Sequence, residues 1–469
     1  MKRIITVVLL LRALTAFADQ AAEGTGVFGA FAASKEWTPP SDPAVLKKLS
    51  AWQDQKLGIL ITWGLYSQWG IVESWSLVTT KHPWNQRPEN FAALDDRDYM
   101  ARYEKLLTTF NPVKFNAEKW AAAFKDAGVK YVLPMAKHHD GFCMWDTATT
   151  DYKITGRQCP FHGDPRADTI QEQCRAFRSA GLSTGIYFSK ADWHSPHYWL
   201  PAAGPGAGQG PNYDPKQQPE EWAKFKDYTW KQIEELMTGY GPQDVLWLDG
   251  GAVRPPNGVD MDGLAAMARR HQPGLIVVDR AVRGLNENYV TPEGEIPGHY
   301  LPYPWETCMV MGTSWAWKPN DHFKSAGTLI RNLCRIVARN GNYLMGIGPD
   351  GAGEFDPVVY DRLKELGAWL KLNGEAVYNT RPVKPYEQAD CVFTGDRAGS
   401  IFAIVLAKDD NSGLPESVPL PTEVVATARN VELLGYGKLK LNTAGTVEIP
   451  AAARTHPPCS QAWAIKITR

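Results

Sequence analysis

Residues 169–189, TIQEQCRAFRSAGLSTGIYFS, contain one complete repeat of the pattern that decides the fold. The first part, up to Gly181, carries apolar residues at helical spacing. The second part, LSTGIYFS, is a short apolar run with the length of a buried strand. The stretch therefore predicts a helix that leads directly into a strand.

The same order recurs between about residues 57 and 375. The apolar runs are LGILITWG (57–64), VKYVLPMAKHHDGF (129–142), DVLWLDGG (244–251), LIVVDRA (275–281) and YLMGIGPDG (343–351). Helices that alternate with such runs are typical of a parallel sheet covered by its crossovers. With six or more units in one row, the α/β pattern favours a (β/α)8-like, TIM-type barrel over an open doubly wound sheet. Active sites of such barrels lie at the carboxyl ends of the strands.

The hydrophobic pattern of the sequence changes after Asn373-Gly374. Short alternating runs such as IFAIVLA (401–407) and AWAIKI (462–467) lie between turns rich in Gly, Pro, Asp and Asn. This pattern predicts a small antiparallel β domain at the C-terminus. We expect the barrel to span residues 19–378 and the C-terminal β domain to span residues 379–469.

The N-terminus has the features of a secretory signal peptide. Lys2 and Arg3 precede an apolar run, and Ala16-Phe17-Ala18 forms a small-x-small cleavage site. We therefore expect residues 1–18 to be removed and the protein to be secreted or periplasmic. No later segment is long enough to predict a membrane span.

Charge and cysteine usage limit the partners. The formal net charge of -1 gives no electrostatic reason to expect a nucleic acid or an acidic lipid surface. The 7 cysteines are an odd number, so at least one stays free or pairs between chains, and a homo-oligomer is left open. No C-x-x-C spacing occurs, which argues against a zinc ribbon or a redox dithiol.

Asp249 and the pair His138-His139 follow predicted strands directly, where barrel chemistry is expected. A carboxylate in this position can act as a nucleophile, a general base or a metal ligand, or it can simply cap the next helix. Neighbouring strand residues point to opposite faces, so at most one histidine faces the barrel axis while the strand stays regular. The histidines also suggest a metal, but no H-E-x-x-H spacing and no third ligand nearby support one.

A second carboxylate is available on the loop-like stretch ENYVTPEGEIPG (287–298), which offers Glu287, Glu293 and Glu295. A glycosidase needs one carboxylate that attacks and one carboxylic acid that protonates the leaving oxygen. A pair on successive loops of a barrel could meet this requirement.

AKHHDGF (136–142) and WETCM (305–309) are the most specific of several stretches that follow one order along the chain. The others are GILITWGLYS, DVLWLDGG, VVDRA, YVTPEGEIP, LIRNLCRIVARNGNYLMGIGPDGAG and WLKLNGEAVYNTRP. In this order they resemble the α-L-fucosidases of glycoside hydrolase family 29, over nearly all of the mature chain. The resemblance implies a catalytic barrel, a C-terminal β-sandwich, and retaining hydrolysis of terminal α-L-fucose from fucosylated glycans without a metal or an organic cofactor.

Residue by residue, the resemblance assigns the nucleophile to Asp249 and the acid/base to Glu293, with Glu295 and Glu287 as alternatives. The resemblance also implies sugar-binding positions, and neighbouring residues complete the expected substrate-binding set. This set is Thr62, Trp63, Glu73, His138, His139, Tyr187, Trp247 and Arg280.

Thr62 is the one position in this set where the chain departs from the family, whose members usually carry a histidine there. Threonine is shorter and cannot become cationic. The departure leaves open a relative that acts on another L-sugar, such as an α-L-galactoside. A non-catalytic carbohydrate-binding protein is a further alternative, although Asp249 and the TPE segment argue against loss of catalysis. We expect Thr62 to line or border the pocket.

Overall fold

One curled parallel sheet forms the N-terminal part of the computed structural model, which describes residues 37–78 and 87–468. The strand order is β5-β4-β3-β2-β1-β7-β6. The strands are β1 (Leu57–Ile61), β2 (Tyr131–Lys137), β3 (Ser183–Ser189), β4 (Val245–Asp249), β5 (Ile276–Asp279), β6 (Trp305–Val310) and β7 (Gly341–Ile347). The predicted signal peptide lies outside the described residues.

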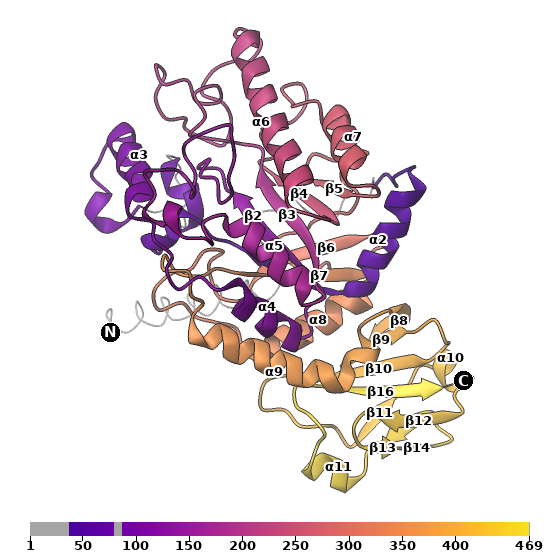
Figure 1. The fold of residues 1–469 in the computed structure, drawn as a ribbon. Coiled ribbons are helices and arrows are strands. Elements are labelled where there is room, and N and C mark those ends of the chain that lie inside the picture. Colours follow the sequence, from indigo (N-terminus) through magenta and orange to yellow (C-terminus); the bar gives the residue numbers. More distant parts are fainter. Residues whose placement is uncertain (1–36, 79–86, 469) are drawn as a thin grey trace, which may run out of the picture.

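Helices cover the outer face of this sheet, as Figure 1 shows. They are α4 (Ala117–Asp126), α5 (Thr169–Ser179), α6 (Pro219–Gly239), α7 (Met261–His271), α8 (Ala326–Ala338) and α9 (Pro357–Asn373). Helix α2 (Pro43–Gln55) lies at the amino ends of the strands, where Lys48 pairs with Asp244 just before β4, and α3 (Asp96–Glu104) packs against the short helices η3 (Glu73–Leu77) and η5 (Lys105–Thr109). Several begin at a side-chain cap: Asn116 accepts from the Lys119 amide, and Asp168 accepts from the Gln171 amide. The helix–strand unit predicted from residues 169–189 is thus α5 followed by β3, and the predicted TIM-like α/β class is confirmed.

Residues 286–294, which we call the bridging segment, fill the place between β5 and β6. The amide of Asn288 donates to Val277 of β5 at 3.0 Å, and the amide of Glu306 in β6 donates to Val290 at 2.9 Å. The segment makes only isolated β-bridges and no regular strand. The barrel therefore has seven regular strands in the described part of the chain and an irregular backbone at the eighth place.

The C-terminal part is antiparallel, as the alternating runs predicted, and forms the β-sandwich that the resemblance implied. A six-stranded antiparallel sheet has the order β13-β12-β16-β10-β9-β8, and a three-stranded sheet has the order β11-β15-β14. Phe393 and Ile465 of the larger sheet share one apolar core with Val447 of the smaller sheet. The elements are β8 (Arg381–Gln388), β9 (Cys391–Gly395), β10 (Ile401–Leu406), β11 (Ser417–Pro419), α10 (Thr422–Val425), β12 (Asn430–Leu433), β13 (Gly437–Lys438), β14 (Lys440–Leu441), β15 (Thr446–Glu448), α11 (Ala451–Thr455) and β16 (Ala462–Thr468).

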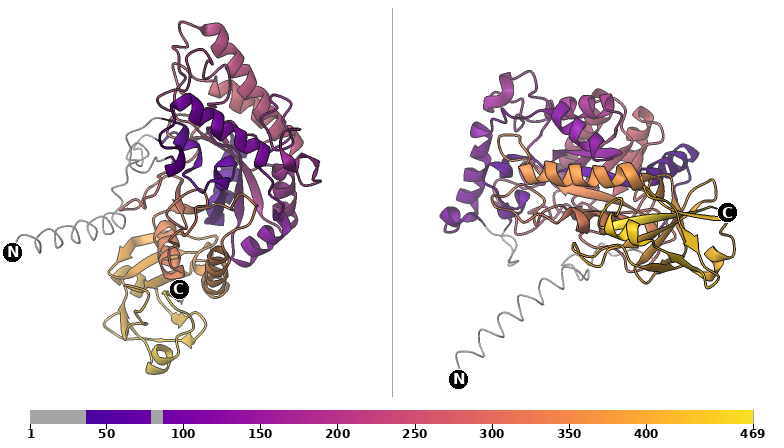
Figure 2. Two further views of the ribbon diagram at one scale, coloured as in Figure 1. Left: turned by 90° about the vertical axis from the view of Figure 1, so that its left-hand side faces the viewer. Right: turned by 90° about the horizontal axis from the view of Figure 1, so that it is seen from below.

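The other face of the six-stranded sheet packs against the barrel. Phe402 and Ile404 belong to the same apolar cluster as the barrel core. The indole of Trp369 in α9 donates to the Ala462 carbonyl of β16 at 2.8 Å. Figure 2 shows the sandwich seated against this side of the barrel. The predicted division after residue 378 falls between the short helix η7 (Gly374–Ala376) and β8.

All seven cysteines carry free thiols, and only Cys459 is not fully buried. None of the helices in the described ranges combines the length and the apolar character needed to cross a bilayer.

Candidate active site

Four strands bring their polar ends together at the carboxyl edge of the parallel sheet. Tyr187 lies on β3 and Asp249 ends β4, while His138 follows β2 and Arg280 follows β5. The adjacent strands β2, β3, β4 and β5 pair in parallel, so these side chains emerge at one edge. This is the edge at which barrels carry their active sites.

Asp249 is held as an ionised carboxylate. Its Oδ2 accepts from the Tyr187 hydroxyl at 2.7 Å and lies 3.6 Å from the Arg280 guanidinium, and its Oδ1 accepts from the Gly250 amide at 2.8 Å. Burial alone would raise its pKa, but the Arg280 charge, His139 and the Tyr187 hydrogen bond hold the pKa well below its usual range. A charged, fixed and 17% exposed carboxylate is ready to attack an electrophilic carbon.

Both histidines reach Asp249, with one potential ligand atom of each residue within 4.8 Å of the others. The strict alternation expected for a regular strand does not apply. The pairing of β2 with β3 shifts between Met135 and Lys137, and β2 ends at Lys137. The chain therefore leaves the strand before His138, and both rings can face the same space.

Both imidazoles are neutral at pH 7. Burial lowers the pKa of His138 well below its usual range. Burial also lowers the pKa of His139, to about 4; the Arg280 and Lys137 charges lower it further, and the Asp249 charge opposes them. Ser189 Oγ donates to the Ala191 carbonyl at 2.7 Å and also contacts His139 Nδ1 at 2.7 Å. Because the single hydroxyl hydrogen goes to Ala191, Nδ1 of His139 carries the ring hydrogen. Nε2 of His139 is then an acceptor that suits a sugar hydroxyl.

Arg280 joins Asp249 to Glu293. One terminal nitrogen of its guanidinium lies near Asp249 Oδ2, and the other donates to Glu293 Oε2 in a very short contact. The Arg280 side chain is 5% exposed and that of Glu293 is 10% exposed. Two carboxylates from separate elements therefore share one buried cation.

The other two glutamates of the 287–298 stretch are placed differently. Glu287 is buried, and its Oε1 accepts from the Ala281 amide at 3.1 Å, so it caps a turn. Glu295 is half-buried, and its backbone carbonyl accepts from Thr307 at 2.7 Å. The Glu293 carboxylate, in contrast, forms an ion pair with Arg280.

Glu73 adds a neutral carboxylic acid to the site. It is buried at a backbone φ of 23°, and its Oε1 accepts from the Ala316 amide at 3.0 Å. Burial and the Asp249 charge raise its pKa to about 8, against the effect of the Ala316 bond. At pH 7 the Glu73 carboxyl therefore holds a proton that it can donate to a ligand.

Thr62 and Trp63 point in different directions. Trp63 packs against Trp120 at 5.5 Å and donates its indole N–H to the Asp350 carbonyl, on the side of the sheet that α4 covers. The Thr62 amide continues the ladder to β7 by donating to Ile347 at 2.9 Å. Because side chains alternate along an extended chain, Thr62 faces the barrel interior. The predicted substrate contact of Trp63 stays a prediction, and the structure gives its indole a packing role.

Comparison with known proteins identifies the family. A family model described as alpha-L-fucosidase matches residues 28–375. The chain belongs to the α-L-fucosidase family. Human plasma alpha-L-fucosidase is 28% identical over 449 residues, which cover 90% of each chain.

Solved fucosidase structures share the whole architecture. Alpha-L-fucosidase isoenzyme 1 from Paenibacillus thiaminolyticus is 27% identical, with a TM-score of 0.75 over 91% of this chain and 99% of that one. A family 29 alpha-L-fucosidase from Bacteroides thetaiotaomicron, trapped as a covalent intermediate with a fluorinated fucose, has the same fold at 23% identity and a TM-score of 0.72, over 94% of this chain and 99% of that one.

The donor set of this fucosidase site fits a sugar better than a metal ion. His138, His139 and Asp249 could in principle surround a cation. However, the Arg280 guanidinium already lies 3.6 Å from Asp249, and both Asp249 oxygens accept hydrogen bonds. A second positive charge beside Arg280 would be repelled, whereas sugar hydroxyls can bond to each of these groups.

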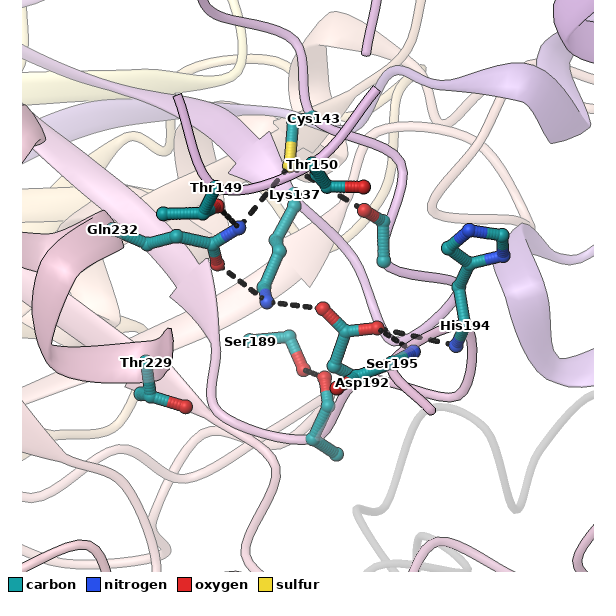
Figure 3. Close-up of polar contacts among 12 residues, drawn as sticks. Lys137, Cys143, Thr149, Thr150, Ser189, Asp192, His194, Ser195, Thr229 and Gln232 are labelled. Atoms are coloured by element: carbon teal, nitrogen blue, oxygen red, sulfur yellow. Dashed lines mark hydrogen bonds and ion pairs between the residues drawn. The ribbon is translucent and has the colours of Figure 1, made fainter. Parts of the chain in front are cut away.

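Sequence reasoning missed a buried ion pair that supports the fucosidase site from behind, shown in Figure 3. Lys137 Nζ lies 2.6 Å from Asp192 Oδ2 and donates to Gln232 at 2.8 Å, and neither charged side chain of the pair is exposed. The amide of Trp193, next to Asp192, donates to the His139 carbonyl at 2.7 Å. The pair thus fixes the loop after β3 against His139. A lysine directly before the two histidines was the available signal.

Proposed function

We propose that the protein is a retaining exo-α-L-fucosidase in which Asp249 is the nucleophile and Glu293 is the acid/base. The observation that carries the proposal is the ionised Asp249 that shares the buried Arg280 guanidinium with Glu293. Further support comes from family membership and from the covalent intermediate of the Bacteroides protein.

In the first step a carboxylate oxygen of Asp249 attacks the anomeric carbon. The bond to the aglycone breaks, its electron pair stays on the leaving oxygen, and that oxygen takes a proton from Glu293. In the second step the Glu293 carboxylate removes a proton from water, whose oxygen displaces Asp249. Each step inverts the anomeric carbon, so the released fucose has the α-configuration of the substrate.

The ion pair between Glu293 and Arg280 must break during the catalytic cycle. A carboxylate on a guanidinium keeps its negative charge, whereas the first step needs Glu293 as an acid. Sugar hydroxyls or the ring oxygen that bind Arg280 would displace Glu293 and let it take up a proton. The neutral acceptor Nε2 of His139 and the neutral acid Glu73 would bind further hydroxyls.

Hydrolysis of 4-nitrophenyl α-L-fucoside tests the proposal. Proton NMR of the early products should show α-L-fucose before mutarotation. Initial release of β-L-fucose would overturn the retaining mechanism, and an intact substrate would leave the fucosidase proposal itself without support.

The charge state of Glu73 predicts an alkaline limit of activity. Since its pKa is raised to about 8 from an ordinary value of 4.5, the carboxyl is neutral below about pH 8 and ionises above it. Ionisation removes a hydrogen-bond donor and adds a second negative charge near Asp249. We expect kcat/KM to fall as pH rises through about 8. In Glu73→Gln, whose amide stays neutral, the fall in kcat/KM above about pH 8 should disappear. If kcat/KM of this variant falls as it does in wild type, Glu73 is not the group that limits activity at alkaline pH.

A second candidate substrate is supported by Thr62. Its buried Oγ1 has no hydrogen-bond partner among the described residues, and a buried polar atom without a partner costs about 1–3 kcal/mol. A sugar that carries one more hydroxyl, such as an α-L-galactoside, could supply that partner.

Two variants of Thr62 separate the substrates. Thr62→Val keeps the shape and removes the hydroxyl, so it should lower kcat/KM for an α-L-galactoside by roughly 10-fold and leave the α-L-fucoside almost unchanged. Thr62→His should raise kcat/KM for the α-L-fucoside relative to that for the α-L-galactoside. Equal effects of Thr62→Val on both substrates would show that the hydroxyl does not contact the sugar.

We also propose that the protein is exported, on the basis of the N-terminal charge, apolar run and cleavage site. N-terminal sequencing of the mature protein should begin near residue 19, and a start at Met1 would contradict export by this route.

A further inference from the structure

Glu306 is a carboxylate in the interior of the barrel, and it lies below the site rather than in it. The residue is fully buried on β6. One oxygen accepts from the Trp247 indole at 3.1 Å and from the Tyr289 hydroxyl at 3.0 Å, and the other accepts from the Tyr131 hydroxyl at 2.5 Å. A carboxyl group in this place needs a physical reason.

The interior of a barrel is normally filled by apolar side chains in layers that alternate strands contribute. Tyr131, Trp247 and Glu306 come from β2, β4 and β6, so they form one such layer. A carboxylate there is costly unless donors surround it, and three donors do. A leucine would fill the layer without this cost, so packing alone does not account for Glu306.

Two of the three donors belong to the elements that carry the reacting carboxylates. Trp247 lies two residues before Asp249 on β4. Tyr289 lies four residues before Glu293 on the bridging segment, which forms isolated β-bridges rather than a regular strand. Glu306 therefore links the strand of one carboxylate to the segment of the other.

Trp247, held by its hydrogen bond to Glu306, contacts two residues of the site. Its ring stacks on Tyr187, with centroids 5.2 Å apart, and Tyr187 donates to Asp249. The Arg280 guanidinium lies 5.0 Å over the same indole. Movement of the Trp247 ring would move both groups that hold Asp249.

We propose that Glu306 is a positioning residue that sets the distance between the nucleophile and the acid/base by bonding to Trp247 and Tyr289 at once. The inference rests on the proposed roles of Asp249 and Glu293. Both carboxyl groups must sit at a defined separation for a retaining reaction, and a shift of about 1 Å can cost about 100-fold in rate.

Glu306→Gln should conserve the function. The amide oxygen can accept from Trp247 and Tyr289, and the amide N–H can donate to the Tyr131 oxygen once that hydroxyl turns. We expect kcat for Glu306→Gln to stay within about threefold of wild type, because one hydrogen bond is rearranged rather than lost. Glu306→Ala should lose about 100-fold in kcat. As a control outside the site, Asp168→Asn neutralises a half-buried carboxylate that accepts from Tyr240, and it should leave kcat unchanged.

Tyr289→Phe and Tyr131→Phe are a matched pair, since each removes one hydroxyl from the same carboxylate. Only Tyr289 lies on the segment that carries Glu293. With a good leaving group, 2-chloro-4-nitrophenyl, departure needs little acid assistance, whereas phenyl needs much more. We expect Tyr289→Phe to lower kcat/KM more for the phenyl α-L-fucoside than for the activated one. Tyr131→Phe should affect both substrates equally.

A stability measurement gives a readout that does not need activity. Burial raises the pKa of Glu306 to about 7 from 4.5, although the three donors and the Arg280 charge lower it. The buried Cys308 thiol is a further titratable group near it. Because the folded protein then holds this proton more tightly than the unfolded chain, the contribution of Glu306 to stability falls as pH rises from about 4.5 to about 7. The melting temperature of Glu306→Gln should therefore rise relative to wild type across this window.

The outcomes separate this inference from the proposed function. If wild type hydrolyses fucosides with retention but Glu306→Ala matches Asp168→Asn in kcat, or if Tyr289→Phe shows no dependence on the leaving group, the positioning role is wrong and the function stands. If wild type is inactive on fucosides, the proposed function fails, while the stability shift still tests the buried network.

Discussion

Replacing Asp249 by alanine is expected to lower kcat on 4-nitrophenyl α-L-fucoside by at least about 10⁴-fold, the scale seen when a residue of a catalytic set is removed. The side chain is the proposed nucleophile, and water cannot replace a carboxylate that the Arg280 charge, His139 and Tyr187 keep ionised. Steady-state kinetics with a check of the folded state by circular dichroism would measure the loss.

Asp244→Asn is a suitable control for this variant. Asp244 lies just before β4, five residues ahead of Asp249, and it pairs with Lys48 near the opposite end of the strand. Its replacement should leave kcat near wild type. Azide added to Asp249→Ala should yield β-L-fucosyl azide, because a single displacement inverts the α-substrate. Activity of Asp249→Ala equal to that of Asp244→Asn would exclude Asp249 as the nucleophile.

The second large effect is expected for Glu293→Ala, and it should depend on the leaving group. For phenyl α-L-fucoside, which needs protonation of the leaving oxygen, we expect a loss in kcat/KM of about 10²–10⁴-fold. For the 2-chloro-4-nitrophenyl substrate the loss in kcat/KM should be much smaller. The reason is that in the first step, which kcat/KM reports, Glu293 supplies only the proton, while Asp249 remains to attack.

Azide should accelerate turnover of Glu293→Ala by attacking the fucosyl-enzyme without base assistance, and the product should be α-L-fucosyl azide. The opposite anomer from Asp249→Ala distinguishes the two roles. Glu295→Ala and Glu287→Ala are direct comparisons, because both residues were candidates and the Glu287 carboxyl accepts a hydrogen bond from the Ala281 amide. If one of these variants shows the leaving-group dependence and Glu293→Ala does not, the assignment moves to that residue.

The residues that regular strands position could be found from the sequence. Asp249 ends an apolar run, and the carboxyl ends of parallel strands share one edge, so periodicity alone placed it near His138 and Tyr187. The histidine pair was harder. Alternation allowed one ring at the site, and a shift in register together with the end of β2 at Lys137 allows both.

Two features depended on contacts that no periodic pattern reports. Glu293 lies on irregular backbone between β5 and β6, so its approach to Arg280 follows from isolated bridges rather than from a strand register. Glu306 reads as one polar residue inside the run WETCM, and its importance appears only when Tyr131, Trp247 and Tyr289 converge on it from distant parts of the chain. An ionisable residue inside a predicted buried strand was the available signal.

The six-stranded sheet of the sandwich has a consequence for how such enzymes can be recombined. One face of the sheet belongs to the sandwich core, and the other face belongs to the core of the barrel. A barrel cut free after residue 378 would expose the apolar surface of α8 and α9, and exposed patches of this kind promote aggregation. A fusion partner or a shuffled module is therefore better joined beyond β16 than in place of the sandwich.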